Sequence, residues 1–246
     1  MRLLPGVHLV GSGWLGFGLS DRDDSHVFLV HDGDDAVLVD AGCGLASERI
    51  AQHIDDAGVP GGTVSRILLT HAHPDHAAGA SSLAELLGAQ VLAAPVTADI
   101  LRRGDEDAAG LTVARAAGLY PPPVRLQAGE VHEIDDGDIV RVGGIELRII
   151  ATPGHAAGHL CFAAQLGGRT VLFSGDLVFS RGRVAVLGTP DTDLRQLATS
   201  LRRVAALRPD VLLPGHGTPV LDDAFAHLDA AVAALDRQQL PPPLLP

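Results

Sequence analysis

The sequence predicts an α/β fold in which two halves, each a β-sheet covered by helices, pack face to face. Short apolar strands alternate with helical segments along the whole chain of 246 residues. The two halves share one rhythm, in which strands are followed by a polar loop and then by a helix. No linker composition separates them, and 46% hydrophobic residues suffice for one large core. We therefore expect residues 1–246 to form a single domain.

The first half is expected to contain a hairpin near its start. The apolar runs 26–30 and 36–40 flank the sequence HDGDD, and Gly33 suits the turn. Gly58 and Gly88 mark the ends of two predicted helices. The expected helices lie at 46–58 and about 76–87, and further strands at 65–70 and 89–95.

Residues 97–118 are polar and carry arginines, and we expect them to be helical until the proline run 121–123 stops them. The second half then repeats the alternation. Its expected strands lie at 138–142, 145–152, 159–165, 170–175 and 210–214, and its helices at 192–207 and from about 222. The tail PPPLLP, residues 241–246, is expected to be a frayed end.

Composition excludes several classes of function. The net charge is −12 and the chain has no lysine, so we expect no nucleic-acid partner. The sequence has no run of about 18 apolar residues, so we expect no membrane partner. The first residues lack the pattern of a signal peptide. Cys43 and Cys161 make no disulfide framework, and Cys161 is expected to be a buried thiol, so we expect a cytoplasmic protein.

The sequence LLTHAHPDHAAG places three histidines and one aspartate within six positions. The predicted strand ends at Thr70, so the cluster forms a strand-to-helix connection, where functional side chains often lie. His71 and His73 are two residues apart, and in an extended segment they point the same way and can bind one ion. Asp75 and His76 follow a proline that turns the chain, so they could hold a second ion. Nitrogen and oxygen ligands suit zinc, and also iron or manganese.

Further ligand-type residues each follow an apolar strand and a small turn residue. These are His155 in ATPGHAAGH, Asp176 in LFSGD and His216 in LLPGHG. All three can gather with the first cluster at one edge of the sheets. Asp40 ends another strand, VLVDAG, and is expected to hold a ligand histidine by its other ring nitrogen. The alternative for Asp40 is an ordinary aspartate that starts a turn.

Taken together, these motifs resemble the metallo-β-lactamase superfamily over residues 7 to about 220. The resemblance implies a four-layer αβ/βα sandwich with a dinuclear metal site at the sheet edge, holding two Zn²⁺ or, alternatively, Fe or Mn. It implies that His71, His73 and His155 hold one ion, that Asp75, His76 and His216 hold the other, and that Asp176 bridges them. A hydroxide held by both ions would be the nucleophile. Asp75 would be the catalytic residue that orients it and shuttles a proton.

Within the superfamily, the motifs favour one branch. Typical β-lactamases have Cys or Ser where this chain has Asp176, whereas TPGHAAGHLCF and FSGDLVF resemble glyoxalase II, the hydroxyacylglutathione hydrolases. Two departures concern the substrate. Only 30 residues follow His216, and lysine is absent, whereas glyoxalase II enzymes usually add helices with basic and tyrosine residues that bind glutathione. The two glycines of the family's ligand loop appear here as Ala78-Gly79. The metal centre therefore carries over, and glutathione specificity does not.

Two segments are expected to form the substrate side. Residues 11–24 are glycine-rich, and we expect either a flap with Trp14 and Phe17 as apolar contacts or a hairpin loop that these aromatics anchor. Residues 97–123, which include Tyr120, are expected to form either a lid or a solvated helix pair.

The first expectation for function is a hydrolase of a thioester, ester or lactone with a small to medium acyl group. The alternatives are a mononuclear iron oxygenase like the persulfide dioxygenases, and a β-lactam or phosphodiester hydrolase. A non-catalytic scaffold is disfavoured because all seven ligand-type residues are present. The expected partner is a small-molecule acyl substrate, and a homodimer is left open.

Overall fold

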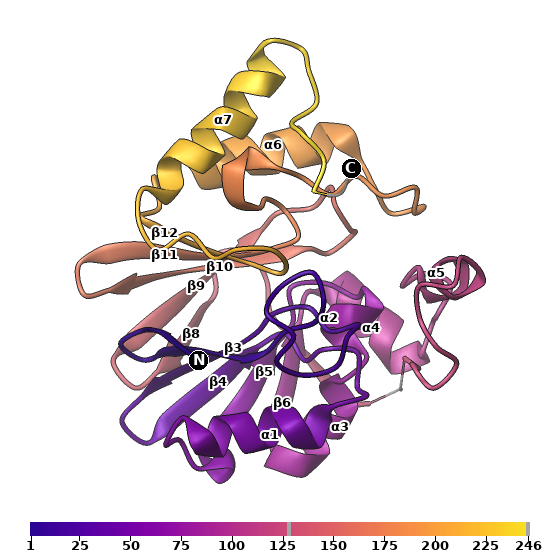
Figure 1. The fold of residues 1–246 in the computed structure, drawn as a ribbon, viewed down its shortest axis with the longest axis vertical. Coiled ribbons are helices and arrows are strands. Elements are labelled where there is room, and N and C mark those ends of the chain that lie inside the picture. Colours follow the sequence, from indigo (N-terminus) through magenta and orange to yellow (C-terminus); the bar gives the residue numbers. More distant parts are fainter. Residues whose placement is uncertain (127–128, 245–246) are drawn as a thin grey trace.

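Two mixed β-sheets lie face to face, and helices cover the outer face of each (Figure 1). The structure, a computed structural model, describes residues 1–126 and 129–244. The predicted α/β architecture is confirmed as an αβ/βα sandwich of four layers.

The first sheet contains seven strands in sequence order: β1 (Arg2–Leu4), β2 (Val7–Gly11), β3 (Val27–Asp32), β4 (Asp35–Val39), β5 (Val64–Leu68), β6 (Gln90–Ala93) and β7 (Val131–Glu133). The first four strands are antiparallel, and β4 to β7 run parallel. Parallel neighbours need crossover connections, and helices form part of them. The helices on this side are α1 (Ser47–Asp56), α3 (Ala80–Leu87) and α4 (Pro95–Arg103).

The second sheet has the order β12-β11-β10-β9-β8. Its strands are β8 (Ile139–Val142), β9 (Ile145–Ala151), β10 (Leu160–Leu166), β11 (Arg169–Gly175) and β12 (Val211–Pro214). Only β11 and β12 pair in parallel. The helices α6 (Leu194–Ala205) and α7 (Ala224–Asp236) cover its outer face, above the sheets in Figure 1.

The strands separate three apolar layers because successive side chains point to opposite faces. In β4, Leu38 packs toward the helices, whereas Val37 and Val39 pack between the sheets. In β11, Phe173 packs between the sheets and Leu172 packs under α6 and α7. Both faces of these strands are buried, which is why they appear in the sequence as continuous apolar runs.

The ends of several strands place ligand-type residues at one edge of the sandwich. Asp40 follows β4, His71 lies three residues after β5, and His155 lies beyond β9. Asp176 directly follows β11, and His216 lies two residues after β12. The predicted sequence of strand, turn and ligand is therefore present at each of these positions.

The helix expected at about 76–87 is wrong in one respect, because it is broken into α2 (Pro74–Ala77) and α3. Gly79 lies at the break and donates its backbone N–H to Gly42. A Cβ on Gly79 would lie 2.1 Å from the carbonyl oxygen of Ala41, so the close passage of these two loops requires glycine here.

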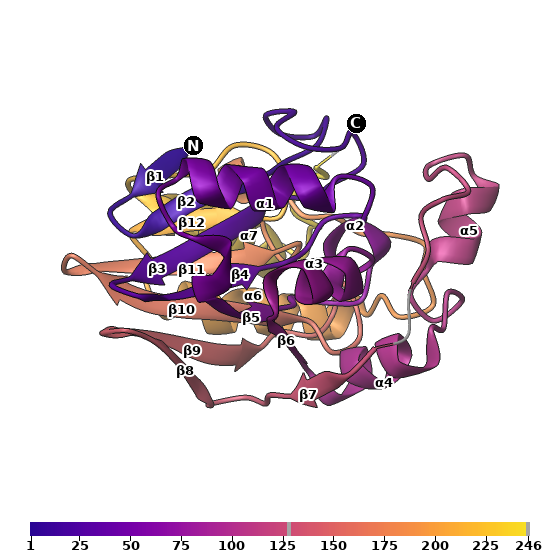
Figure 2. The same cartoon turned by 90° about the horizontal axis from the view of Figure 1, so that it is seen from below.

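The segment 97–118 is helical as expected, but in two parts. The segment forms α4 and α5 (Leu111–Ala116), which are separated by Gly104 and Gly110 in left-handed conformations. Both views show α5 standing at the periphery, apart from the two sheets (Figures 1 and 2).

The tail expected to be frayed is paired instead. Val184 donates its N–H to Pro242 over 2.9 Å, and Leu244 donates to Val184 over 2.8 Å. Residues 245–246 of that predicted end lie outside the described part of the chain. The short strands β1 and β7 were not expected. Among the described residues, no helix combines the length and apolar character needed to cross a membrane.

Candidate metal centre

The structure brings all seven predicted ligand residues together. Three groups form, in each of which one ligand atom per residue lies within 4.8 Å of the others. The groups are His71, His73 and His155; His71, His76 and Asp176; and Asp75, His76 and His216. Because the groups share members, they make one continuous cluster rather than three separate sites.

The loop after β5 positions four of these side chains. His73 is extended, with φ −60° and ψ 146°, as expected for a residue before proline. Pro74 then starts α2, and this single turn carries Asp75 and His76. The rings of His71 and His73 lie 4.5 Å apart between centroids, so the extended segment does bring them together.

Hydrogen bonds to one ring nitrogen of His71 and of His155 leave the other ring nitrogen facing the cluster. The Nδ1 of His155 lies 2.9 Å from the carbonyl oxygen of Ala185 and donates to it. The Nε2 of His155 then faces Nδ1 of His73 at 3.1 Å. The Nδ1 of His71 lies 2.9 Å from the hydroxyl of Thr70. Such outward contacts fix the tautomer and leave the other nitrogen free to bind a cation.

Asp176 lies between the two halves of the cluster. Its Oδ1 is 3.3 Å from Nε2 of His76, and its Oδ2 is 3.7 Å from Nε2 of His155. His216 Nε2 lies 3.5 Å from the same Oδ2 and 3.0 Å from Oδ2 of Asp75. Asp176 therefore occupies the position expected of a carboxylate shared by two ions.

Several buried polar atoms of the cluster have no hydrogen-bond partner within the described part of the chain. These atoms include Nε2 of His71, and also Nε2 of His76 and Oδ1 of Asp176, which lie 3.3 Å apart without forming an aligned hydrogen bond. Leaving one such atom unpaired costs about 1–3 kcal/mol, so their convergence indicates a set of donors for cations. The donors are imidazole nitrogens and carboxylate oxygens, which suit zinc, iron or manganese. The residues thus fit a dinuclear metal site.

Protonation differs across the cluster. Burial and the neighbouring imidazoles lower the pKa of His71 well below its ordinary value, so this ring is neutral. Burial also opposes the charge of His76 and His216, but the carboxylates of Asp75 and Asp176 outweigh it and raise both histidine pKa values. Metal ions bound by Asp75, His76 and His216 would replace the protons on these two histidines.

Asp40 lies behind the cluster, in contact with His76. Its buried carboxylate accepts hydrogen bonds from the backbone N–H of Thr70 at 2.8 Å and from Nδ1 of His76 at 2.8 Å. The hydroxyl of Thr70 also donates to it and contacts His71, so one carboxylate orients two histidines. Asp40 has φ 63°, a conformation that aspartate and asparagine tolerate better than most residues.

Asp40→Ala is expected to fold and to bind metal about 10- to 100-fold more weakly, because His76 loses the acceptor that orients it. The affinity is measured by competition against a chromophoric chelator, with thermal melting as the check of folding. Asp40→Asn is the matched control, since it keeps an acceptor and the left-handed backbone and should lose less. Unchanged affinity in Asp40→Ala would remove Asp40 from the site.

Two contacts of the cluster were missed from the sequence. Oδ2 of Asp191 lies 3.5 Å from Nε2 of His73 and stabilises that ring from outside. His159 is fully buried and accepts the backbone N–H of Asp176 over 3.2 Å. His159 stands in the quoted motif TPGHAAGHLCF, which could have identified it, whereas the loop around Asp191 carries no such signal.

A cavity of about 290 Å³ opens above the cluster. Trp14 and Tyr120 line it, together with His73, Asp75 and other members of the cluster. Tyr120 lies beside Asp75, and burial followed by the Asp75 charge raises the tyrosine pKa. Phe17 is not among the lining residues, and its ring packs near His26 at 5.8 Å between centroids.

Cys161 takes no part in the site. It is buried in β10, where burial raises its pKa to about 12, so a thiolate nucleophile is excluded at neutral pH.

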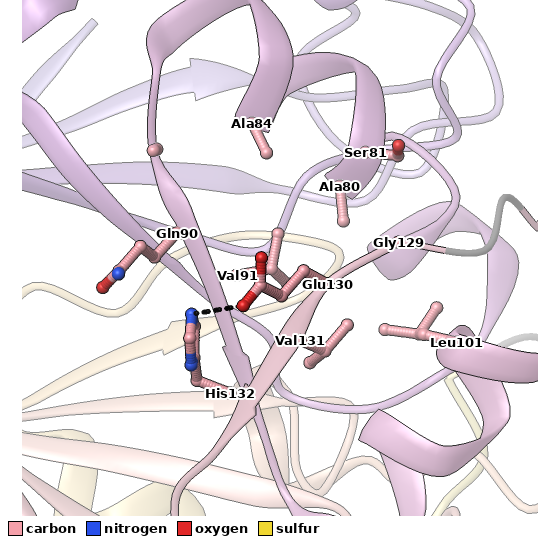
Figure 3. A pocket seen from close by; sticks show the side chains of 11 residues that line it. Ala80, Ser81, Ala84, Gln90, Val91, Leu101, Gly129, Glu130, Val131 and His132 are labelled. Carbon is pink, nitrogen blue, oxygen red and sulfur yellow. Dashed lines mark ion pairs between the residues drawn. The ribbon is translucent and has the colours of Figure 1, made fainter.

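A second cavity, of about 270 Å³, lies between α3 and the strands β6 and β7 (Figure 3). Glu130 and His132 form an ion pair across 3.8 Å at its rim. No member of the cluster lines this cavity, so the cavity above the cluster is the candidate site.

Comparison with known proteins agrees with this geometry. Residues 20–216 match a family model described as the metallo-beta-lactamase superfamily. A hydroxyacylglutathione hydrolase of Acidiphilium cryptum is 33% identical over 215 residues, covering 86% of this chain and 72% of that protein. One of Cereibacter sphaeroides is 30% identical over 208 residues, covering 82% of this chain and 66% of that protein.

A solved structure supports the fold. It is described as a metallo-beta-lactamase of Cronobacter sakazakii and superposes with a TM-score of 0.73. The sequence identity is 22%, and the match covers 97% of this chain and 96% of that one.

Proposed function

Because the chain belongs to the metallo-beta-lactamase superfamily, we propose that it is a metal-dependent hydrolase of a thioester, ester or lactone with a small to medium acyl group. One observation carries the proposal above the others. Six buried histidine and aspartate side chains and the half-buried Asp75, some with unpaired ligand atoms, converge at the base of a largely apolar cavity. Ligand pockets commonly combine such an apolar lining with a few convergent polar groups.

Divalent ions bound by the seven ligand residues would supply a water of lowered pKa and would polarise the substrate carbonyl. The residues of this chain have separate tasks around that chemistry. Asp75 faces the cavity, and although burial opposes its charge, His76 and His216 lower its pKa, so it is ionised. An ionised carboxylate at this position can orient a water and accept its proton.

Tyr120 is proposed to position Asp75 and to contact the substrate. Tyr120 lies beside Asp75 and belongs to the lining, and its raised pKa keeps the hydroxyl protonated and able to donate. The segment 97–123 therefore reaches the site through Tyr120, which supports the proposed lid.

The names of the relatives support the thioester class, since both are called hydroxyacylglutathione hydrolases. The same lining argues against a highly charged phosphodiester. Arg22 is the only arginine or lysine among the described residues that line the cavity, and it is already paired with Asp23 at 3.9 Å.

A substrate panel tests this assignment. Acyl-glutathione and acyl-CoA thioesters, homoserine lactones, a chromogenic cephalosporin and bis(p-nitrophenyl) phosphate are compared by kcat/KM on the same metal-loaded protein. We expect an acyl thioester or lactone to be turned over fastest. A value for the phosphodiester well above every acyl compound would end the acyl assignment.

A further inference from the structure

The C-terminal segment forms one wall of the cavity above the cluster. In Figure 1 the chain leaves α7 and runs back to the end marked C. Pro243 pairs with Val184 in a parallel bridge, and the two hydrogen bonds around Val184 fix this segment in place. Pro243 and Leu244 both line the cavity. A Cβ on Gly217 would lie 4.0 Å from Cδ1 of Leu244, so this side chain packs beside the residue that follows His216.

The segment paired with the tail continues the same wall. Val184 to Leu187 line the cavity, and the carbonyl of Ala185 accepts the hydrogen bond from His155. The wall is therefore tied directly to one predicted metal ligand. A change in the tail can act on the substrate pocket without replacing any residue of the cluster.

Large apolar side chains around this cavity are unusually exposed. Leu119 is 64% exposed, Trp14 59% and Val186 42%, and all three belong to the lining. A contiguous set of exposed apolar side chains marks a binding surface. Because this surface lies beside the cluster, we expect it to contact an apolar part of the substrate.

Charge narrows the class of substrate further. Arg22 lies 6.0 Å from the ring centroid of Trp14 and pairs with Asp23, and Asp23 adds a carboxylate to the rim. A carboxylate on the acyl group would find no free cation among the described lining residues. A neutral apolar group carries no charge that would have to be buried without a partner.

We propose that the wall made by residues 242–244 and 184–187 receives a neutral, apolar acyl chain, and that Leu244 is a specificity-determining residue for its length. The assignment to an acyl chain rests on the proposed function. The existence of an apolar binding wall does not rest on that function. Ligand binding therefore tests the wall, and turnover tests the function.

Binding is measured through Trp14, the only tryptophan of the chain, which lies in the lining. Unreactive n-alkanamides from acetamide to octanamide are titrated against its fluorescence. We expect affinity to rise on the order of threefold per buried methylene. The amide of the same length with a terminal carboxylate should bind more weakly. Equal affinity along the series, or tighter binding of the carboxylates, would overturn the proposal.

Leu244→Ala should weaken octanamide by about tenfold and leave acetamide unchanged, because the removed carbons contact only the longer chain. Leu240→Ala is the matched control, since Leu240 is 56% exposed in the same tail and is not part of the lining. Leu244→Phe keeps the wall and should shift the preference toward shorter chains. Melting curves verify that each variant folds.

Turnover of n-acyl thioesters completes the test. The wild type should show kcat/KM rising with acyl length, and Leu244→Ala should flatten that rise through KM. If the amides follow the binding trend but no thioester, ester or lactone is turned over, the proposed function fails and the apolar wall stands. If thioesters are turned over without length preference, and Leu244→Ala behaves like Leu240→Ala, the wall proposal is wrong while the function stands.

Discussion

Asp176→Ala is expected to lose more than about 100-fold in turnover and most of the metal at the second position. Changes to residues that only contact ligands already cost about 10- to 100-fold. Asp176 belongs to the ligand cluster itself, with one oxygen 3.3 Å from His76 and the other 3.7 Å from His155. Its removal also takes a carboxylate from His216. The variant is assayed by steady-state kinetics and by metal content after dialysis.

Two further variants separate a lost ligand from a damaged fold. Asp176→Asn keeps the volume and one oxygen, so it should fold like the wild type and retain metal better than Asp176→Ala. Asp23→Ala removes a carboxylate that lines the same cavity but belongs to none of the three groups, and it should keep its metal. Full activity in Asp176→Ala would remove Asp176 from the site.

Removing metal with a chelator is expected to lower turnover by more than about 1000-fold, since losing even one oxyanion donor costs about 100- to 1000-fold. Stability should fall as well. A ligand present at 1000 times its dissociation constant stabilises the native state by roughly 4 kcal/mol. For a chain of this size that corresponds to a melting temperature lower by about 8–16 °C.

Calorimetry and a turnover assay on the same samples test this second expectation. Protein dialysed in parallel without chelator is the control for handling. Adding zinc back should restore both the melting temperature and the activity, which distinguishes metal loss from irreversible damage. Full activity of the chelated protein, verified to be free of metal, would contradict a metal-dependent mechanism.

The convergence of the ligands could be predicted in part from chain order. Each strand is an apolar run with a definite end, and His155, Asp176 and His216 each stand just past such an end. Strands that run in the same direction end at the same edge of a sheet, and β9, β11 and β12 share one direction in the second sheet. Asp40 could be placed at the same edge because it directly follows β4, and its left-handed backbone conformation does not change that position.

Other features depend on contacts between distant segments and left no local pattern. The break between α2 and α3 follows from the approach of Gly79 to Ala41, which no periodicity in that helix reveals. The tail carries prolines without alternation, and its order comes from pairing with Val184. Tyr120 was proposed for the substrate side from its segment alone, whereas its contact with Asp75 required the folded chain.

The central claim is that this chain holds two transition-metal ions with its seven histidine and aspartate ligands. Elemental analysis of protein purified without chelator measures this most directly. We expect close to two equivalents per chain, chiefly zinc. A stoichiometry near one, or iron alone, would contradict the claim and would favour the mononuclear iron oxygenase instead.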